Sequence, residues 1–208
     1  MRGFAKYGPV LPEPFVELAR RRIKPQVSAS ASFVYLDLDP ADLLLARCVD
    51  TLLPLAFLAF GNRAQLLRAQ LTETPSASTL PDRSWHRDLP VDSTTPVSLT
   101  AIFYLDDVLH AGHTYVIPAG SHPPAFLDHS DNREIAITAC AGDCLVLSGS
   151  VWHTGSAPSP GARRRALILQ FGYWWIKQQT QKNLEAGFIE ETVYGRKSPP
   201  GDLYIHDR

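Results

Sequence analysis

Two histidines and one aspartate in this chain have the residue types and spacing of a mononuclear metal site. His86 and Asp88 stand at positions i and i+2, and His153 lies far downstream. Side chains at i and i+2 of an extended segment point to the same side, so the first two can reach one metal ion together. Two imidazoles and one carboxylate can occupy one face of an octahedral metal and leave three positions open, which is typical of non-haem Fe(II) oxygenases. The third ligand must then come from a strand that the fold brings alongside.

A run of three arginines follows the second histidine, from Arg163 to Arg165. A guanidinium offers a planar, two-pronged donor that matches a carboxylate and stays charged when it is buried. Neighbouring residues of an extended segment alternate between its two sides, so Arg164 can point inward while the flanking arginines point out. The alternative is that all three belong to an exposed basic turn.

Short β-strands separated by glycine and proline turns are expected along most of the chain. This pattern is typical of a sandwich or barrel, and we favour a double-sheet jelly roll because such folds enclose a site between two sheets. The length of 208 residues suits one domain, with the jelly-roll core over about residues 66–176. The expected strands are Ser32 to Leu38, Leu66 to Thr72, Val97 to Leu105, Thr114 to Pro118, Glu134 to Ala139, Cys144 to Leu147 and Arg165 to Trp175.

Two helices are expected before the core, and one after it. The segment from Pro14 to Arg22 has helical apolar spacing and a basic end. Asp39 followed by Pro40 predicts a helix start, with the helix running to about Leu53 and interrupted at Pro54. A further helix is expected over residues 179–191.

The composition is that of an ordinary globular protein, with 45% hydrophobic and 20% charged residues and a net charge of -1. No global field favours nucleic acid or a membrane surface, and no apolar run of membrane-spanning length is evident. Residues 1–7 lack the apolar stretch of a secretory signal, so a cytoplasmic protein is expected. The three cysteines have no metal-site spacing and are expected to be reduced thiols.

Further motifs follow the histidine–aspartate pair in a fixed order: Gly112-His113-Thr114, Pro118-Ala119-Gly120-Ser121-His122, Gly142-Asp143, Trp152-His153 and Arg164. Taken together, they resemble the phytanoyl-CoA dioxygenase family of Fe(II)/2-oxoglutarate oxygenases over about residues 71–173. The family's Pro-Gly-Ser-His stretch carries an inserted alanine here. The N-terminal third has no recognisable motif, so the resemblance says nothing about a substrate lid.

The resemblance implies a cupin-like double-stranded β-helix with flanking N-terminal helices, and Fe(II), 2-oxoglutarate and O2 as cofactor and co-substrates. It implies that His86, Asp88 and His153 bind iron. By family spacing, Arg164 rather than Arg165 grips the distal carboxylate of 2-oxoglutarate, and the Thr114 hydroxyl contacts the carboxylate nearer the iron. The expected reaction is oxidation, most simply hydroxylation, of a small molecule in a biosynthetic tailoring step, with release of succinate and CO2.

Halogenases of this chemistry have a small residue in place of the carboxylate ligand, so Asp88 favours oxygen transfer or another outcome of hydrogen abstraction. Three other classes stay open: a zinc hydrolase or isomerase at the same triad, a non-catalytic jelly-roll binding protein, and a nucleic-acid demethylase. Arg164 has no role in the zinc scheme, a binding protein needs no intact triad, and the near-neutral charge disfavours nucleic acid. Five aromatic residues are candidates for the lining of an apolar cavity or for ordinary core: Trp85, Tyr104, Trp152, Phe171 and Tyr173.

Overall fold

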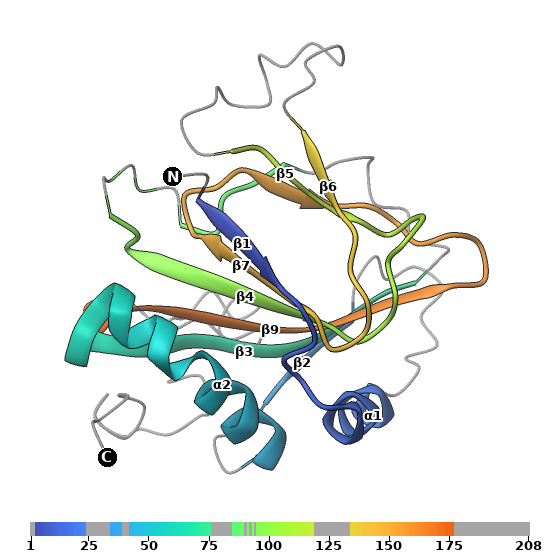
Figure 1. Cartoon of the computed structure of the whole chain (residues 1–208), viewed down its shortest axis with the longest axis horizontal. Helices are drawn as coiled ribbons and strands as arrows, with labels where there is room; N and C mark the ends of the chain where they lie inside the picture. Colours follow the sequence, from blue (N-terminus) through green and yellow to red (C-terminus); the bar gives the residue numbers. More distant parts are fainter. Residues whose placement is uncertain are drawn as a thin grey trace.

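The computed structural model describes residues 3–23, 34–38, 42–75, 85–89, 91, 93, 95–118 and 134–176. These residues form two antiparallel sheets with two helices on one side (Figure 1). The larger sheet contains β1 (Phe4–Tyr7), β2 (Val34–Asp37), β3 (Ala64–Pro75), β4 (Ser98–Tyr104), β7 (Cys144–Ser148) and β9 (Arg163–Tyr173). The smaller sheet contains β5 (Thr114–Val116), β6 (Ile135–Ile137) and β8 (His153–Gly155).

The strand order is β1-β7-β4-β9-β3-β2 in the larger sheet and β6-β5-β8 in the smaller one. Strands that follow one another along the chain therefore often belong to different sheets, and every paired neighbour is antiparallel. This is the connectivity of a jelly roll, which confirms the fold expected from the sequence.

The two faces of the larger sheet have different partners because side chains alternate along each strand. Phe103, Leu167 and Leu169 lie on the outer face, in an apolar cluster that includes the buried residues of both helices. Tyr104, Ala166 and Leu145 lie on the inner face and pack with residues of the smaller sheet in a second cluster. The site predicted from the sequence requires the space between the sheets, which is this inner face.

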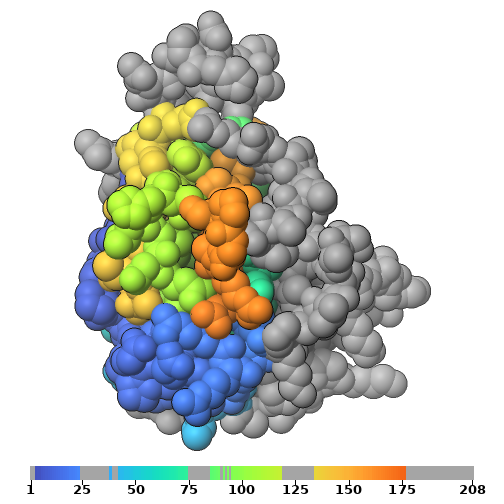
Figure 2. Space-filling model, turned by 90° about the vertical axis from the view of Figure 1, so that its right-hand side faces the viewer, coloured from blue at the N-terminus to red at the C-terminus, as the bar shows by residue number. Residues whose placement is uncertain are grey.

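Helix α1 (Glu13–Arg22) begins with Pro14 in its first turn and ends in a basic turn, as expected. Val16 and Ala19 are buried in the outer cluster. The helix lies beside the larger sheet at the end where β9 begins, shown in blue beneath the orange chain in Figure 2.

Helix α2 (Leu43–Phe60) differs from the sequence prediction at both ends. Its N-cap is Asp42, whose side chain accepts a hydrogen bond of 2.9 Å from the Leu44 amide, so the prediction of a cap at Asp39 is wrong. The helix also continues through Pro54, which is exposed, to a positive-φ cap at Gly61. Proline removes one backbone hydrogen bond, and packing of the helix against the sheet compensates for that loss. The short 3-10 helix η1 (Gly61–Arg63) then leads into β3.

The expectation that no apolar run reaches membrane-spanning length is also wrong. By length and composition alone, the stretch Leu43–Arg63 is long and apolar enough to cross a bilayer. A core helix passes the same test, and the buried residues of α2 recur at helical spacing and belong to the outer core cluster. Those residues are Leu44, Leu45, Cys48, Leu52, Ala56 and Phe60.

The expected core strands are present with bounds shifted by a few residues, and β1 and β8 were not anticipated.

Cys48, Cys140 and Cys144 are free thiols. Burial raises the pKa of Cys48 to about 12, which makes its thiolate, the reactive form, scarce. The helix expected over residues 179–191, most of the predicted loop from Thr74 to Ser84, and His122 lie outside the described residues.

Candidate metal centre and carboxylate site

The two histidines are brought together by a short piece of antiparallel pairing. The backbone N–H of His86 donates to the carbonyl of His153, and the N–H of His153 donates to the carbonyl of His86, both at 3.0 Å. Residues paired in this way project their side chains to the same face. The two imidazole rings accordingly lie with their centroids 4.3 Å apart.

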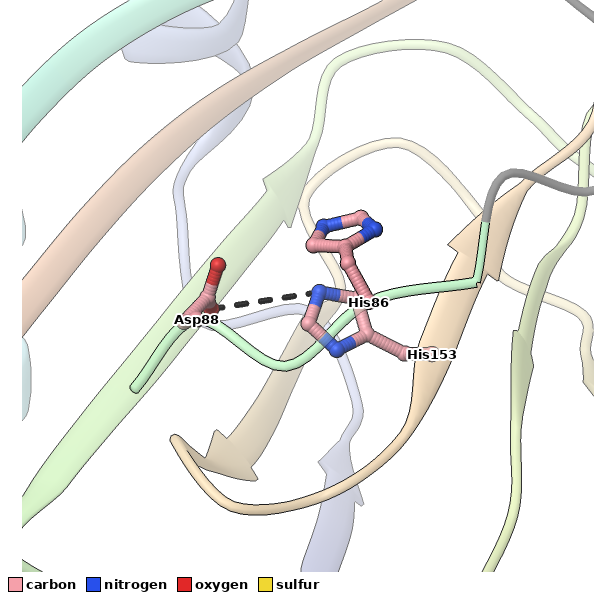
Figure 3. Close-up of side chains that lie close together, drawn as sticks. All are labelled: His86, Asp88 and His153. Carbon is pink, nitrogen blue, oxygen red and sulfur yellow. Dashed lines mark ion pairs between the residues drawn. The ribbon is translucent and has the colours of Figure 1, made fainter. Parts of the chain in front are cut away.

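Asp88 completes a three-residue cluster with the two histidines (Figure 3). One ligand atom from each side chain lies within 4.8 Å of the others, and the Asp88 Oδ2 to His153 Nε2 distance is 3.8 Å. His153 is buried, Asp88 is half-buried and His86 is exposed. The cluster is therefore closed on the side of β8 and open on the side of His86, as a metal site with exchangeable positions requires.

The orientation of His153 is set by its other ring nitrogen. Nδ1 lies 3.0 Å from the carbonyl oxygen of Val151. A carbonyl accepts only, so Nδ1 carries the proton and Nε2 presents its lone pair toward Asp88. Burial lowers the pKa of His153, although the nearby Asp88 carboxylate opposes the shift. His153 is thus held as a neutral imidazole, the form that binds metals.

Asp88 is oriented by a hydroxyl from the central part of the larger sheet. Thr100, on the inner face of β4, donates a hydrogen bond of 2.5 Å to Asp88 Oδ2. Thr100 is 3% exposed, so this bond is shielded from water. The interaction ties the segment 85–89 to a long central strand and restricts rotation of the carboxylate.

The opposite face of the histidine pair carries a cation–π contact. Arg87 and Trp152 are the next residues along the two paired segments, and the guanidinium carbon lies 5.1 Å from the centre of the Trp152 ring. Such contacts contribute about 0.5–1 kcal/mol at exposed sites. This contact joins the two paired segments on the side opposite to His86 and His153.

A second polar group lies beside the metal cluster and contains the arginine selected from the sequence. Arg164 Nη2 donates to Thr114 Oγ1 at 3.0 Å, and the Tyr104 hydroxyl donates to the same oxygen at 2.8 Å. Burial raises the pKa of Tyr104, so the phenol keeps its proton and remains a donor. Since Thr114 Oγ1 already accepts two hydrogen bonds, its own proton is available for an acceptor such as a carboxylate oxygen.

Gly155 makes room for the arginine. A Cβ atom at this position would lie 2.5 Å from Arg164 Nη1, closer than side chains tolerate. Gly155 and His153 occupy the same face of β8, and Thr114 pairs with Gly155 while Val116 pairs with His153. Thr114, with Arg164 beside it, therefore lies diagonally across the smaller sheet from His153, at the separation of about 7–8 Å that is typical of such neighbours.

The arrangement bears on the two roles that the family resemblance implied for opposite carboxylates of 2-oxoglutarate. In the structure the side chains of Arg164 and Thr114 are hydrogen-bonded to each other, so both can face one anionic group.

The structure places aromatic candidates on different faces of the larger sheet. Tyr104 faces the interior and is fully buried. Phe171 and Tyr173 belong to the outer face, where Tyr173 contacts Phe60 edge-on with ring centres 5.1 Å apart. Trp152 points away from the histidines, toward Arg87. The structure thus places Tyr104 beside the site and assigns Phe171 and Tyr173 to ordinary core, two alternatives that the sequence had left open.

Sequence reasoning missed three contributors: Thr100, Gly155 and the Val151 carbonyl. Alternation within Val97 to Leu105 places Thr100 and Tyr104 on one face, which was the available signal for Thr100. Nothing in the sequence indicated Gly155, because its role is defined by an arginine on another strand. His113 is half-buried beside Tyr115, and within the described ranges its Nε2 has no hydrogen-bond partner.

No family model matches the chain. Its fold is similar to solved structures of known enzymes. One is HygX from Streptomyces hygroscopicus with nickel, 2-oxoglutarate and hygromycin B bound, which is 18% identical with a TM-score of 0.66 over 87% of this chain and 87% of that one. Another is the non-haem α-ketoglutarate-dependent epimerase SnoN from nogalamycin biosynthesis, 19% identical with a TM-score of 0.63 over 83% of this chain and 79% of that one. At these identities the similarity establishes the jelly-roll fold of such enzymes.

Proposed function

We propose that this protein is an Fe(II)- and 2-oxoglutarate-dependent oxygenase that oxidises a small molecule. The observation that carries the proposal is the juxtaposition of two groups on the inner face: the His86–Asp88–His153 cluster and the Arg164–Thr114 pair. The first suits a metal ion with open positions, and the second suits a carboxylate. The two stand one cross-strand step apart, a separation that a five-carbon dicarboxylate can span.

The donor set fits ferrous iron. Two imidazoles and one carboxylate are borderline and hard ligands, and the nitrogen of His153 that faces Asp88 carries no proton. Zinc also accepts these ligands, but a zinc hydrolase needs no dedicated carboxylate group beside the metal. The Arg164–Thr114 pair therefore favours the iron reading over zinc, and the intact triad disfavours a purely binding role.

The chain's own residues have distinct tasks in this proposal. His86, Asp88 and His153 hold the metal ion, with Asp88 oriented by Thr100. Arg164 binds and neutralises the distal carboxylate of 2-oxoglutarate, and Thr114 donates its remaining proton to the same carboxylate. When bound, iron and 2-oxoglutarate supply the chemistry that activates O2 and oxidises a C–H bond, with release of succinate and CO2.

We propose hydroxylation of a small-molecule metabolite as the outcome, as the resemblance to phytanoyl-CoA dioxygenases implies. SnoN is described as an epimerase, so the same fold also accommodates a different fate of the oxidised carbon. Both outcomes begin with removal of a substrate hydrogen, and Asp88 fills the metal position that halogenation requires for a halide. HygX holds hygromycin B, which is consistent with a small-molecule substrate here.

The proposal is tested by absorption spectroscopy and by product analysis. Anaerobic protein with Fe(II) should develop a visible charge-transfer band on addition of 2-oxoglutarate, and this band should be absent with Zn(II). Aerobic incubation with a panel of small-molecule metabolites should release succinate in step with one oxidised product. His86→Ala should abolish both signals. A wild-type protein that binds zinc tightly and shows no band with iron and 2-oxoglutarate would refute the proposal.

A further inference from the structure

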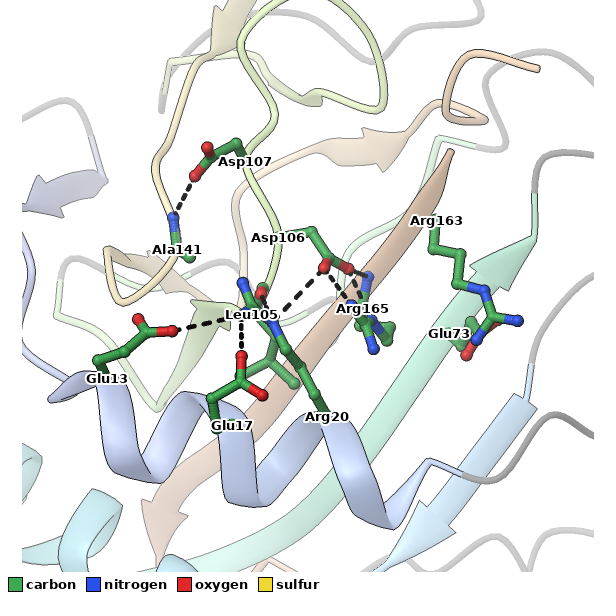
Figure 4. Close-up of polar contacts among 10 residues, drawn as sticks. All are labelled: Glu13, Glu17, Arg20, Glu73, Leu105, Asp106, Asp107, Ala141, Arg163 and Arg165. Atoms are coloured by element: carbon green, nitrogen blue, oxygen red, sulfur yellow. Dashed lines mark hydrogen bonds and ion pairs between the residues drawn. The ribbon is translucent and has the colours of Figure 1, made fainter. Parts of the chain in front are cut away.

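Asp106 lies just after β4, between helix α1 and the start of β9 (Figure 4). The pairing of β4 with β9 ends at Tyr104 and Ala166, but the Leu105 N–H still donates to the carbonyl of Arg165 at 3.0 Å. Beyond this point the chain turns away from β9. The acceptor for the Arg165 backbone N–H is therefore a side chain instead of a backbone carbonyl of β4.

That side chain is the carboxylate of Asp106. The backbone N–H of Arg165 donates to Asp106 Oδ2 at 2.8 Å, which takes the place of a hydrogen bond between strands. The same carboxylate binds the Arg165 guanidinium in a two-pronged arrangement, with Nε to Oδ2 at 2.9 Å and Nη2 to Oδ1 at 2.5 Å. This is the strongest geometry available to an arginine–carboxylate pair. Both the backbone and the side chain of Arg165 are therefore fixed by one residue.

Fixing Arg165 has a direct consequence for its neighbour. Adjacent residues of a strand face opposite sides, so an outward Arg165 requires an inward Arg164. The flanking Arg163 is also on the outside, 3.6 Å from Glu73 Oε1. The ladders with β3 and β4 set the register of β9, but beyond Ala166 the β4 side of the strand is no longer paired. Asp106 replaces that missing neighbour and holds Arg165 on the outer side.

Helix α1 supports Asp106 from the other side. Arg20 Nε donates to the Leu105 carbonyl at 2.6 Å and lies 3.7 Å from Asp106 Oδ1. Arg20 is itself paired with Glu17 one turn earlier in the helix. The chain before and after Asp106 is thus held by the helix, while its carboxylate is held by β9. In Figure 2 the blue helix and the orange start of β9 meet on one surface.

We propose that Asp106 is a positioning residue of the co-substrate site, acting through Arg165 to hold Arg164 against Thr114. The inference rests on the proposed function, because it assigns 2-oxoglutarate to Arg164. It adds that the affinity for the co-substrate depends on a carboxylate on the opposite face of the sheet, anchored by the N-terminal helix.

The test is a titration of 2-oxoglutarate into anaerobic Fe(II) protein, read by the charge-transfer band. In Asp106→Ala the dissociation constant should rise roughly tenfold or more, as for loss of a group that orients a ligand-binding residue. The intensity of the band at saturation and the affinity for Fe(II) should stay at wild-type values. General destabilisation would not weaken 2-oxoglutarate binding alone. Asp106→Asn keeps an acceptor for the Arg165 amide, so its dissociation constant for 2-oxoglutarate should rise less. If Asp106→Ala does not fold, the titration of Asp106→Asn replaces it.

Asp107→Ala is the matched control. Asp107 is the next residue and also accepts a backbone hydrogen bond, from Ala141 at 2.8 Å, but it contacts neither Arg164 nor Arg165 among the described interactions. The dissociation constant of the Asp107→Ala variant for 2-oxoglutarate should equal that of the wild type. Equal affinity in Asp106→Ala and wild type, or the same loss in Asp107→Ala, would overturn the positioning role alone. Absence of the band in the wild type would instead refute the proposed function and the positioning role with it.

Discussion

The two ends of the proposed site, one for the metal ion and one for a carboxylate, are built in contrasting ways. The proposed metal ligands come from a three-residue strand and from the segment 85–89, which are joined by one pair of backbone hydrogen bonds. At the other end, Arg164 lies on β9, an 11-residue strand, and Tyr104 lies at the buried end of β4. The hydroxyl of Thr114, from the three-residue β5, accepts a hydrogen bond from each of them. Long paired strands fix side chains before a ligand arrives, whereas short segments rely on a few side-chain contacts. We therefore expect the carboxylate end to be preorganised and the metal end to be completed by the ion when it binds.

The largest effect is expected at the metal end, from Asp88→Ala. This change removes the only charged ligand of the cluster, and we expect the affinity for Fe(II) to fall by more than roughly 100-fold, beyond the range for residues that only orient a ligand. Isothermal titration with Fe(II) under anaerobic conditions measures it. The free energy of unfolding of the metal-free protein should fall by about 1–3 kcal/mol, since the change leaves the buried Thr100 hydroxyl without its acceptor. A retained iron affinity would remove Asp88 from the metal.

A smaller but still large effect is expected at the carboxylate end, from Arg164→Met. Loss of a partly buried, charge-assisted pair with a ligand carboxylate costs about 2 kcal/mol or more, which corresponds to a rise of roughly 30-fold in the dissociation constant for 2-oxoglutarate. The iron affinity should be unaffected, because the two ends are built separately. Arg165→Met serves as a comparison and should show a smaller rise. If Arg164→Met leaves the 2-oxoglutarate requirement unchanged, the role passes to Arg165.

The smallest effect on iron affinity is expected at Thr100, which links the long strand β4 to the short segment 85–89. In Thr100→Val the hydroxyl that orients Asp88 is lost while the shape is nearly kept, and the iron affinity should fall roughly tenfold. Thr100→Ser restores the donor and should recover most of this loss. Anaerobic titration of both variants with Fe(II) measures these affinities. An unchanged affinity in Thr100→Val would show that the segment 85–89 needs no support from the sheet, and would weaken the contrast between the two ends.

The core strands could be predicted because their signals are local. Alternating apolar residues and turn residues define the strands that became β3, β4, β7 and β9, and only their ends shifted. The prediction that helix α2 is interrupted at Pro54 is wrong for a local reason as well: proline predicts a break, but the apolar residues beyond it pack against the sheet and continue the helix. The strands β1 and β8 have four and three residues, too few to show a period. They exist because neighbouring strands pair with them, β7 with β1 and β5 with β8.

By itself, the sequence determined which residues can do chemistry and which of them share a face. His86 and Asp88 share one side by their spacing, and Arg164 faces away from its two neighbours by alternation. Only the tertiary structure decided that His153 pairs with His86, that Thr114 and Tyr104 meet Arg164, and that Thr100 holds Asp88. Periodicity within a strand is a property of neighbouring residues. The register between strands depends on the packing of the whole sheet, and no local pattern contains it.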